Sequence, residues 1–166
     1  GADVIKIEGF DGDAGRMMKA NHPLGRNPYF ESCNRSKRGV VVNLKSEAGR
    51  EVIYRLVKDA DVFVQNFRQG VAGRLEMDYQ TLKQHNPMLI YASANGYGPK
   101  GPESAGPSFD GCGQARAGLM LAATPFGASE PSTVQGGVSD QIGAIMVCLG
   151  VLSALVARHE QGIGQE

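Results

Sequence analysis

The sequence predicts an α/β fold in which helices flank a parallel β-sheet. Short apolar, β-branched segments, of which Val40–Val42 is the clearest, alternate along the chain with segments of helical periodicity. Turn-forming residues separate them, as Gly39 and Asn43 do around that segment. Strands joined through helices lie parallel with right-handed crossovers, and ligands then bind at their carboxyl ends.

The first half of the chain contains three of the predicted strands. Val4–Ile7 is a short apolar strand, and residues 9–30 are expected to form a loop because they show no periodicity. After Val40–Val42, Ser46 is placed to cap a helix, and Asp61–Val64 is the third strand. The apolar stripe of that helix consists of Val52, Ile53, Leu56 and Val57.

The second half adds one strand and three helices. Asp78–Asn86 is expected to be a short helix that ends before a proline, and Met88–Ala92 is the fourth strand. Prolines make 97–107 an ordered loop, and Gly111–Ala122 reads as a helix of small residues. Ile142–Ala157 is too short and too rich in small residues for a comfortable membrane span, so we expect a buried core helix.

Composition excludes several functional classes. The 17 basic residues balance the 17 acidic residues, so no net field favours nucleic acid or membrane. The cysteines form no Cys-x-x-Cys pair, which indicates reduced thiols in a cytoplasmic protein, with Cys148 in the core. The histidines lack metal-ligand spacing, so no metal site is expected. These residues are Cys33, Cys112, Cys148, His22, His85 and His159.

Asp140 has two natural interpretations. It follows Gly136 and Gly137 and directly precedes the apolar helix. An aspartate there can cap the helix, accepting hydrogen bonds from the first free N–H groups. It can also act as a nucleophile, since the glycines let a substrate approach closely. Local sequence leaves both roles open, and one carboxylate can fill both.

Basic residues gather near the predicted strand ends. Lys37 and Arg38 precede the second strand, Lys45 follows it, and Arg68 and Arg74 follow the third. These are either ordinary surface charges or a site for an anionic small molecule.

One motif must be rejected. Gly96–Gly101 matches Gly-x-Gly-x-x-Gly, but Pro102 and Pro107 follow where a dinucleotide site needs a helix. The sequence also lacks the signatures of P-loop nucleotidases, zinc proteases and serine hydrolases.

Short segments along the whole chain form an ordered set. In order and spacing this set resembles the family III CoA-transferases, the CaiB/BaiF class. The segments are Gly1–Glu8, Ser36–Arg38, Asn43–Lys45, Ala60–Val62, Gln65–Val71, Arg74–Leu75, Asn86–Tyr91, Gly96–Gly98 and Gly162–Gln165.

The resemblance implies a Rossmann-like large domain that is truncated at both ends. Residues 1–166 would be part of that CoA-binding and catalytic domain, with no second domain in this chain. About 30 residues carrying a first strand and helix would precede Gly1, on the usual size of a βαβ unit. Members of the family form interlocked homodimers, so we expect the isolated segment to be poorly stable.

The resemblance also assigns site residues. Asp140 matches the catalytic aspartate. Gly9 and Pro107 stand where some relatives have an arginine and a lysine, so phosphate contacts are not expected at these two positions. The CoA-lining positions are Val42, Asn43, Leu44, Lys45, Asn66, Phe67, Arg68, Arg74, Gly106, Pro107, Ser108 and Phe109.

The implied reaction moves CoA from an acyl-CoA donor to a carboxylic acid through an aspartyl anhydride and an aspartyl-CoA thioester. CoA is a substrate, and no metal or redox cofactor is expected. Racemases of the same family need a histidine where this chain has Phe109, before Asp110. The alternatives that stay open are such a racemase and a non-catalytic CoA-binding fragment. The sequence does not identify the donor or acceptor acid.

Overall fold

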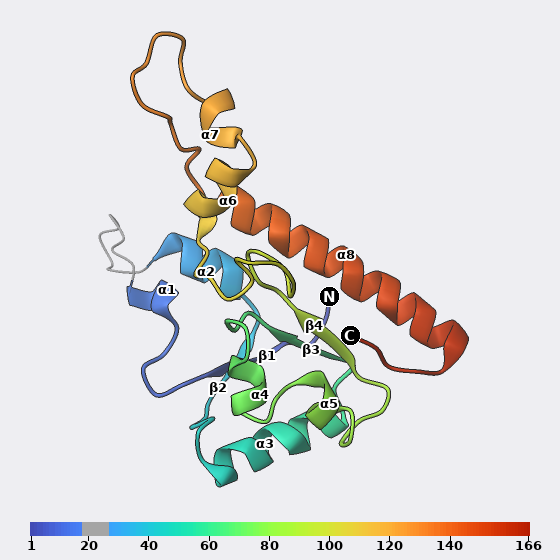
Figure 1. Cartoon of the computed structure of the whole chain (residues 1–166). Coiled ribbons are helices and arrows are strands. Elements are labelled where there is room, and N and C mark those ends of the chain that lie inside the picture. The colour runs from blue at the N-terminus through green and yellow to red at the C-terminus, as the bar shows by residue number, and fades with distance from the viewer. Residues whose placement is uncertain (18–26) are drawn as a thin grey trace. The chain divides into compact units, whose positions relative to one another are not determined.

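The computed structural model describes residues 1–17 and 27–166, which divide into two compact units, 1–55 and 56–166 (Figure 1). Each unit contains one parallel pair of strands, so the predicted α/β class with parallel strands is confirmed. Residues 18–26 of the predicted loop, with His22, lie outside the described residues.

The first unit is built on strands β1 (Ile5–Glu8) and β2 (Arg38–Val41), which pair in parallel with Ile5 opposite Arg38. Two helices, α1 (Ala14–Met17) and α2 (Pro28–Asn34), lie in the connection between them. The prediction of a loop throughout 9–30 was therefore wrong for these helical residues. Asn27 caps α2 through the N–H groups of its first turn, and proline at the first helical position suits this start.

An ion cluster holds the segment after β1. Glu8 is buried, and Arg16 donates two hydrogen bonds to its carboxylate at 2.8 and 3.0 Å. Lys6 pairs with both Glu8 and Asp13. The bonds from Arg16, assisted by Lys6, outweigh the cost of burial and lower the pKa of Glu8 to about 2.

Helix α3 (Glu47–Lys58) starts in the first unit and ends in the second. The predicted cap is confirmed, since Ser46 Oγ accepts a hydrogen bond from the Gly49 N–H at 3.1 Å. Ile53 and Val57 of the predicted stripe are buried, whereas Val52 is exposed.

The second unit pairs β3 (Val62–Gln65) in parallel with β4 (Ile90–Ser93). Between them lie α4 (Val71–Arg74) and α5 (Tyr79–Leu82). The predicted helix over 78–86 was too long: α5 ends at Leu82, and a turn then leads to Asn86, whose side-chain amide donates to the Val57 carbonyl of α3 at 3.0 Å. The buried side chains of this unit include Val57, Met77, Leu82, Leu89, Ile90, Tyr91 and Gln114.

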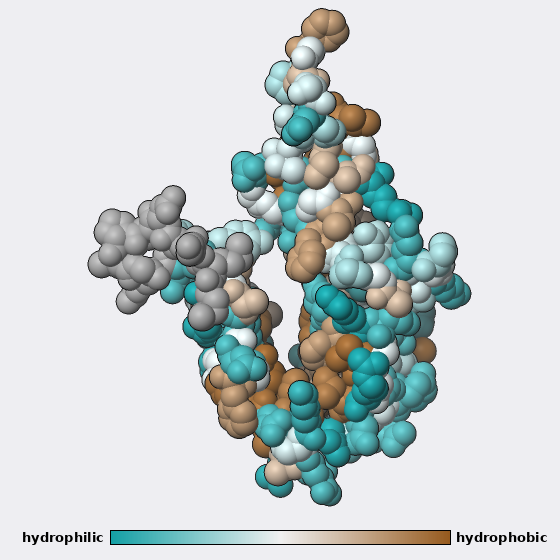
Figure 2. Space-filling model, turned by 60° about the vertical axis from the view of Figure 1, so that its left-hand side comes forward, coloured by the Kyte–Doolittle hydropathy of each residue, from teal (hydrophilic) through white to brown (hydrophobic). Residues whose placement is uncertain are grey.

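The loop over 97–107 contains no helix, as predicted. The single helix expected over 111–122 is two helices, α6 (Asp110–Arg116) and α7 (Leu119–Ala122). Gly118 adopts a left-handed conformation, with φ of 74°, and breaks the helix there. Figure 2 shows apolar surface on the segment that carries α7 and the loop after it, where Leu121 and Phe126 are exposed.

Helix α8 (Val138–Gln161) runs between two left-handed glycines and packs along β4 (Figure 1). The expectation of a buried helix was wrong for the described residues, because one apolar face of α8 is exposed, and Cys148 is exposed rather than in the core. By length and composition alone α8 is apolar enough to cross a membrane, a property that core helices of soluble proteins share. The exposed apolar side chains are Ile142, Ile145, Met146, Leu149, Leu152 and Val156.

Candidate active site

Asp140 lies in the first turn of α8 but does not cap it. The cap residue is Gly137, whose left-handed backbone starts the helix and which has no side chain to bond the free N–H groups. Asp110 supplies the acceptor instead: its Oδ1 accepts hydrogen bonds from the N–H of Ser139 at 2.7 Å and of Asp140 at 3.3 Å. The capping role proposed for Asp140 was therefore wrong, because a carboxylate thirty residues earlier occupies that position.

Asp110 is itself held by a buried glutamine. The Gln114 side chain is completely buried, and its Nε2 donates to Asp110 Oδ2 at 2.6 Å and to the Val134 carbonyl at 2.8 Å. The Val134 N–H donates back to Gln114 Oε1 at 2.8 Å. These bonds fix the segment that leads into α8 against α6.

Helices α6 and α8 approach closely at a glycine. A Cβ on Gly113 would lie 2.9 Å from Cβ of Ser139, closer than real Cβ contacts come. The absence of a side chain at Gly113 therefore lets α6 reach the start of α8, as Figure 1 shows.

The surroundings of Asp140 favour its protonated form. The residue is exposed overall, yet the protein around its carboxyl raises its pKa above the ordinary value, and the negative charge of Asp110 adds to this. Within the described residues the Asp140 carboxylate accepts no hydrogen bond.

The first group of predicted CoA-lining residues lies in the first unit. Val42 is buried, while Asn43 and Lys45 are exposed and Leu44 is half-buried. Asn43 Oδ1 accepts from the Lys45 N–H at 3.1 Å, and the Asn43 carbonyl accepts from Ser46. These bonds fold the end of β2 into a tight turn and leave the Lys45 side chain exposed.

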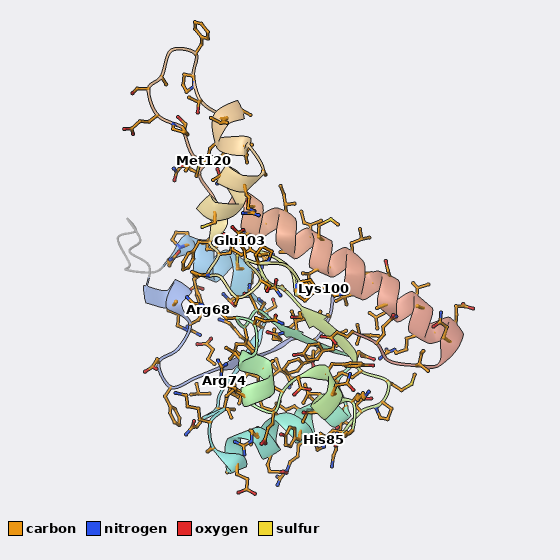
Figure 3. The ribbon with its side chains drawn as sticks, viewed as in Figure 1. Arg68, Arg74, His85, Lys100, Glu103 and Met120 are labelled. Atoms are coloured by element: carbon orange, nitrogen blue, oxygen red, sulfur yellow. The ribbon has the colours of Figure 1, made fainter. Side chains whose placement is uncertain are left out.

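The second group lies in the second unit, after β3. Gln65 anchors it by donating to Ser93 Oγ at 2.8 Å and accepting from the Phe67 N–H at 2.6 Å. Asn66 precedes this bonded N–H and is exposed. Arg68 and Arg74 extend from this loop and from α4 (Figure 3), and both are exposed to solvent.

The third group leads directly into α6. A Cβ on Gly96 would lie 2.1 Å from Cβ of Ser108, so a glycine is required for the two loops to meet. Gly106 and Ser108 are half-buried, and Pro107 is exposed. Phe109 is the cap residue of α6, immediately before Asp110, and 74% of it is exposed. The structure thus brings Phe109 and Asp140 to the same helix junction.

A separate cavity of about 760 Å³ lies between β4 and α8. Tyr91, Asn95 and Val151 contribute to its lining, and Asn95 Oδ1 is buried without a hydrogen-bond partner. Among the described residues that line it, Glu166 alone is charged, so the cavity does not suit the phosphates of CoA.

Comparison with known proteins decides the family. The family model described as CoA-transferase family III matches residues 1–166. The chain belongs to this family. It is 42% identical over 165 residues to acetyl-CoA:oxalate CoA-transferase of Acetobacter aceti and 38% identical over 176 residues to succinyl-CoA:mesaconate CoA-transferase of Haloarcula marismortui. Both matches cover 99% of this chain and, respectively, 42% and 43% of the relative, so the chain spans less than half the length of these enzymes.

Solved structures agree with this family assignment. A CaiB/BaiF family protein from Brucella suis superposes with a TM-score of 0.90 at 36% identity, covering 99% of this chain and 44% of that one. The predicted resemblance to family III CoA-transferases and their α/β fold is thus confirmed.

The part of the chain that the structure describes contains no group of three or more histidine, cysteine, aspartate or glutamate side chains arranged to hold a metal ion.

The sequence did not predict the residues that cap α8 beside Asp140. Asp110 entered the prediction only as the neighbour of Phe109, and Gln114 did not enter it at all. A Gln or Asp at those positions has no local signature, because their partners lie 20 to 30 residues away in sequence. The one signal in the sequence was a long polar side chain, Gln114, directly after three small residues.

Proposed function

We propose that the protein to which this chain belongs transfers CoA from an acyl-CoA donor to a carboxylic acid, with Asp140 as the nucleophile. The observation that supports this most directly is the Asp140 carboxylate itself, which lies at the start of α8 and, among the residues that the structure describes, has no hydrogen-bond partner, because Asp110 occupies the cap. A raised pKa makes the ionised carboxylate more basic and so a better nucleophile. The relatives named as CoA-transferases support the same reaction class.

The reaction proceeds in four exchanges. An Asp140 oxygen bonds the thioester carbonyl carbon of the donor, and CoA leaves as the thiolate with the C–S electron pair, giving an anhydride. The thiolate attacks Cγ of Asp140, the Cγ–O bond to the acyl group breaks, and the donor acid departs as a carboxylate. The acceptor carboxylate attacks Cγ of the aspartyl thioester and releases the CoA thiolate, giving a second anhydride. The thiolate then attacks the acceptor carbonyl carbon of this anhydride, the bond from that carbon to the Asp140 oxygen breaks, and the new acyl-CoA and the Asp140 carboxylate are formed. Splitting the exchange into these steps is the purpose of covalent catalysis.

Lys45, Arg68 and Arg74 are the residues that we assign to the CoA phosphates. All three are exposed cations that follow strands, and their guanidinium and ammonium groups suit phosphate oxygens. No step requires a metal or redox cofactor, because the thioester supplies the activation. The two acids remain open: the relatives are named for oxalate and mesaconate, which indicates carboxylic acids as a class.

We further propose that the protein is cytoplasmic and works as a homodimer. The exposed apolar face of α8 supports burial against protein, since monomers rarely leave so large an apolar surface in water.

A racemase is the second reaction considered within the family. It needs two bases flanking the α-carbon, and the residue before Asp110 is Phe109, which titrates no proton. We therefore favour transfer.

The test is exchange of label between an acyl-CoA and a free acid by the natural full-length protein. The proposal predicts exchange without release of free CoA and its loss in Asp140→Ala, while CoA binding persists. Exchange that survives Asp140→Ala would remove the nucleophile assignment. CoA binding without any exchange would support the non-catalytic alternative, and inversion at the α-carbon would support the racemase.

A further inference from the structure

Two carboxylates meet at the start of α8, and they have different roles. Asp110 accepts both hydrogen bonds from the N–H groups of Ser139 and Asp140, while the Asp140 carboxylate accepts none within the described residues. We propose that Asp110 is a positioning residue for the nucleophile: by capping α8 in place of Asp140, it keeps the Asp140 carboxylate unbonded and available to the thioester. This inference rests on the proposed function of Asp140.

The physical basis is competition for the free N–H groups of the first helical turn. An aspartate in that turn ordinarily bonds these groups or is stabilised by the helix dipole, and its pKa falls. A carboxylate in that state is a weaker base and its lone pairs are engaged, so it attacks a carbonyl less readily. Asp110 takes those donors, and the pKa of Asp140 is raised instead, first by the protein that surrounds its carboxyl and then by the negative charge of Asp110.

The arrangement is rigid because buried groups support it. Gln114 bonds the second oxygen of Asp110 and both backbone groups of Val134, and its side chain has no contact with solvent. Gly113 allows α6 to lie against Ser139. Asp110 is therefore fixed in position and orientation before any substrate arrives, as preorganised catalytic groups require.

Other charged groups around α8 do not compensate for Asp110. Helix α6 also carries Cys112 and Arg116, and Arg116 is paired with Glu103. Helix α7 and strand β4 carry no ionisable group other than Tyr91, whose hydroxyl donates to the Met77 carbonyl at 3.0 Å. The charge that acts on Asp140 is that of Asp110.

The test compares Asp110→Ala and Asp110→Asn with the parent in the natural full-length protein, using kcat, KM for the acyl-CoA and the pH profile of kcat. We expect Asp110→Ala to lower kcat about 10- to 100-fold with little change in KM, the scale of a misplaced reacting group. Asp110→Asn keeps one oxygen for the Ser139 N–H and should recover part of the rate. Both variants remove a negative charge beside Asp140 and so should lower its pKa. The acid limb of the kcat–pH profile should therefore move to lower pH in both.

Asp78→Ala is the matched control, because Asp78 caps α5 through the Thr81 N–H at 3.1 Å and lies outside the site. It should lose stability without moving the acid limb. A folded Asp110→Ala with parental kcat and pH profile would overturn the proposal, and if that variant does not fold, an unshifted acid limb in Asp110→Asn would do so. The function of Asp140 is judged separately: parental exchange in Asp140→Ala defeats the proposed function whatever the Asp110 variants show.

Discussion

Replacing Gly49 by alanine should destabilise the protein, although alanine is the better helix former. Gly49 lies in the first turn of α3, where a Cβ would stand 1.9 Å from the Asn43 carbonyl oxygen and 2.7 Å from its carbon. An ordinary contact needs about 3.5 Å, so the carbonyl must move by about 1.5 Å. A backbone carbonyl cannot rotate aside as a flexible side chain can, so the turn that contains Asn43 must shift.

The magnitude follows from what that movement breaks. The Asn43 carbonyl accepts bonds from the Ser46 N–H at 3.1 Å and the Ser46 hydroxyl at 2.9 Å. Each bond contributes about 1 kcal/mol, and forced overpacking costs about 1–3 kcal/mol more. Alanine returns about 1 kcal/mol through helix propensity. We therefore expect a net loss of about 2–4 kcal/mol in the free energy of unfolding.

Urea denaturation of the natural full-length protein measures this loss. Gly73→Ala is the matched control, because a Cβ there meets nothing within 4 Å, and it should be neutral or stabilising by up to about 1 kcal/mol. Gly49→Ala should also weaken CoA binding, since Asn43 and Lys45 share the displaced turn. A Gly49→Ala protein as stable as Gly73→Ala would refute the reasoning.

Two other predictions concern charge. Because the folded pKa of Glu8 is about 2 against an ordinary 4.5, its ion cluster stabilises the fold above pH 4.5 and loses that contribution as the pH falls toward 2. Glu8→Gln should lower the free energy of unfolding by about 1–2 kcal/mol at pH 7, a value reduced because Arg16 is half exposed to solvent. The variant should also lose less stability than the parent between pH 4.5 and 2, and an unchanged dependence of stability on pH would contradict this. Arg74→Gln should raise KM for acyl-CoA about 10-fold with kcat unchanged, the effect of one lost charged phosphate contact. Arg55→Gln, an exposed arginine on α3, is its control, and equal KM values for the two variants would remove Arg74 from the site.

Local patterns were sufficient to predict the strands and the start of α3. The β-branched runs and Ser46 carry their information within a few residues, and the structure places β2 and the Ser46 cap within a residue or two of the prediction. The Asn27–Pro28 start of α2 was also readable, because an asparagine cap followed by proline is a helix start signal. It was missed because the surrounding segment has no apolar period.

Features that depend on distant partners were not predictable. The break at Gly118 reflects a left-handed backbone that a glycine permits but does not require. The cap of α8 comes from Asp110, and no window around Asp140 contains it. The apolar composition of α8 predicted a buried core helix. Burial depends on which elements pack against a helix, and the sequence of the helix does not contain that information.

The central claim is that Asp140 carries the acyl group and then CoA. The direct measurement is to incubate the natural full-length protein with a donor acyl-CoA, quench with hydroxylamine and locate the modified residue by peptide mass spectrometry. Hydroxylamine converts an aspartyl anhydride or thioester to a hydroxamate on the side chain, so the account predicts this modification at Asp140, dependent on acyl-CoA and absent in Asp140→Ala. An active protein with no modification at Asp140, or with the modification on another residue, would contradict it.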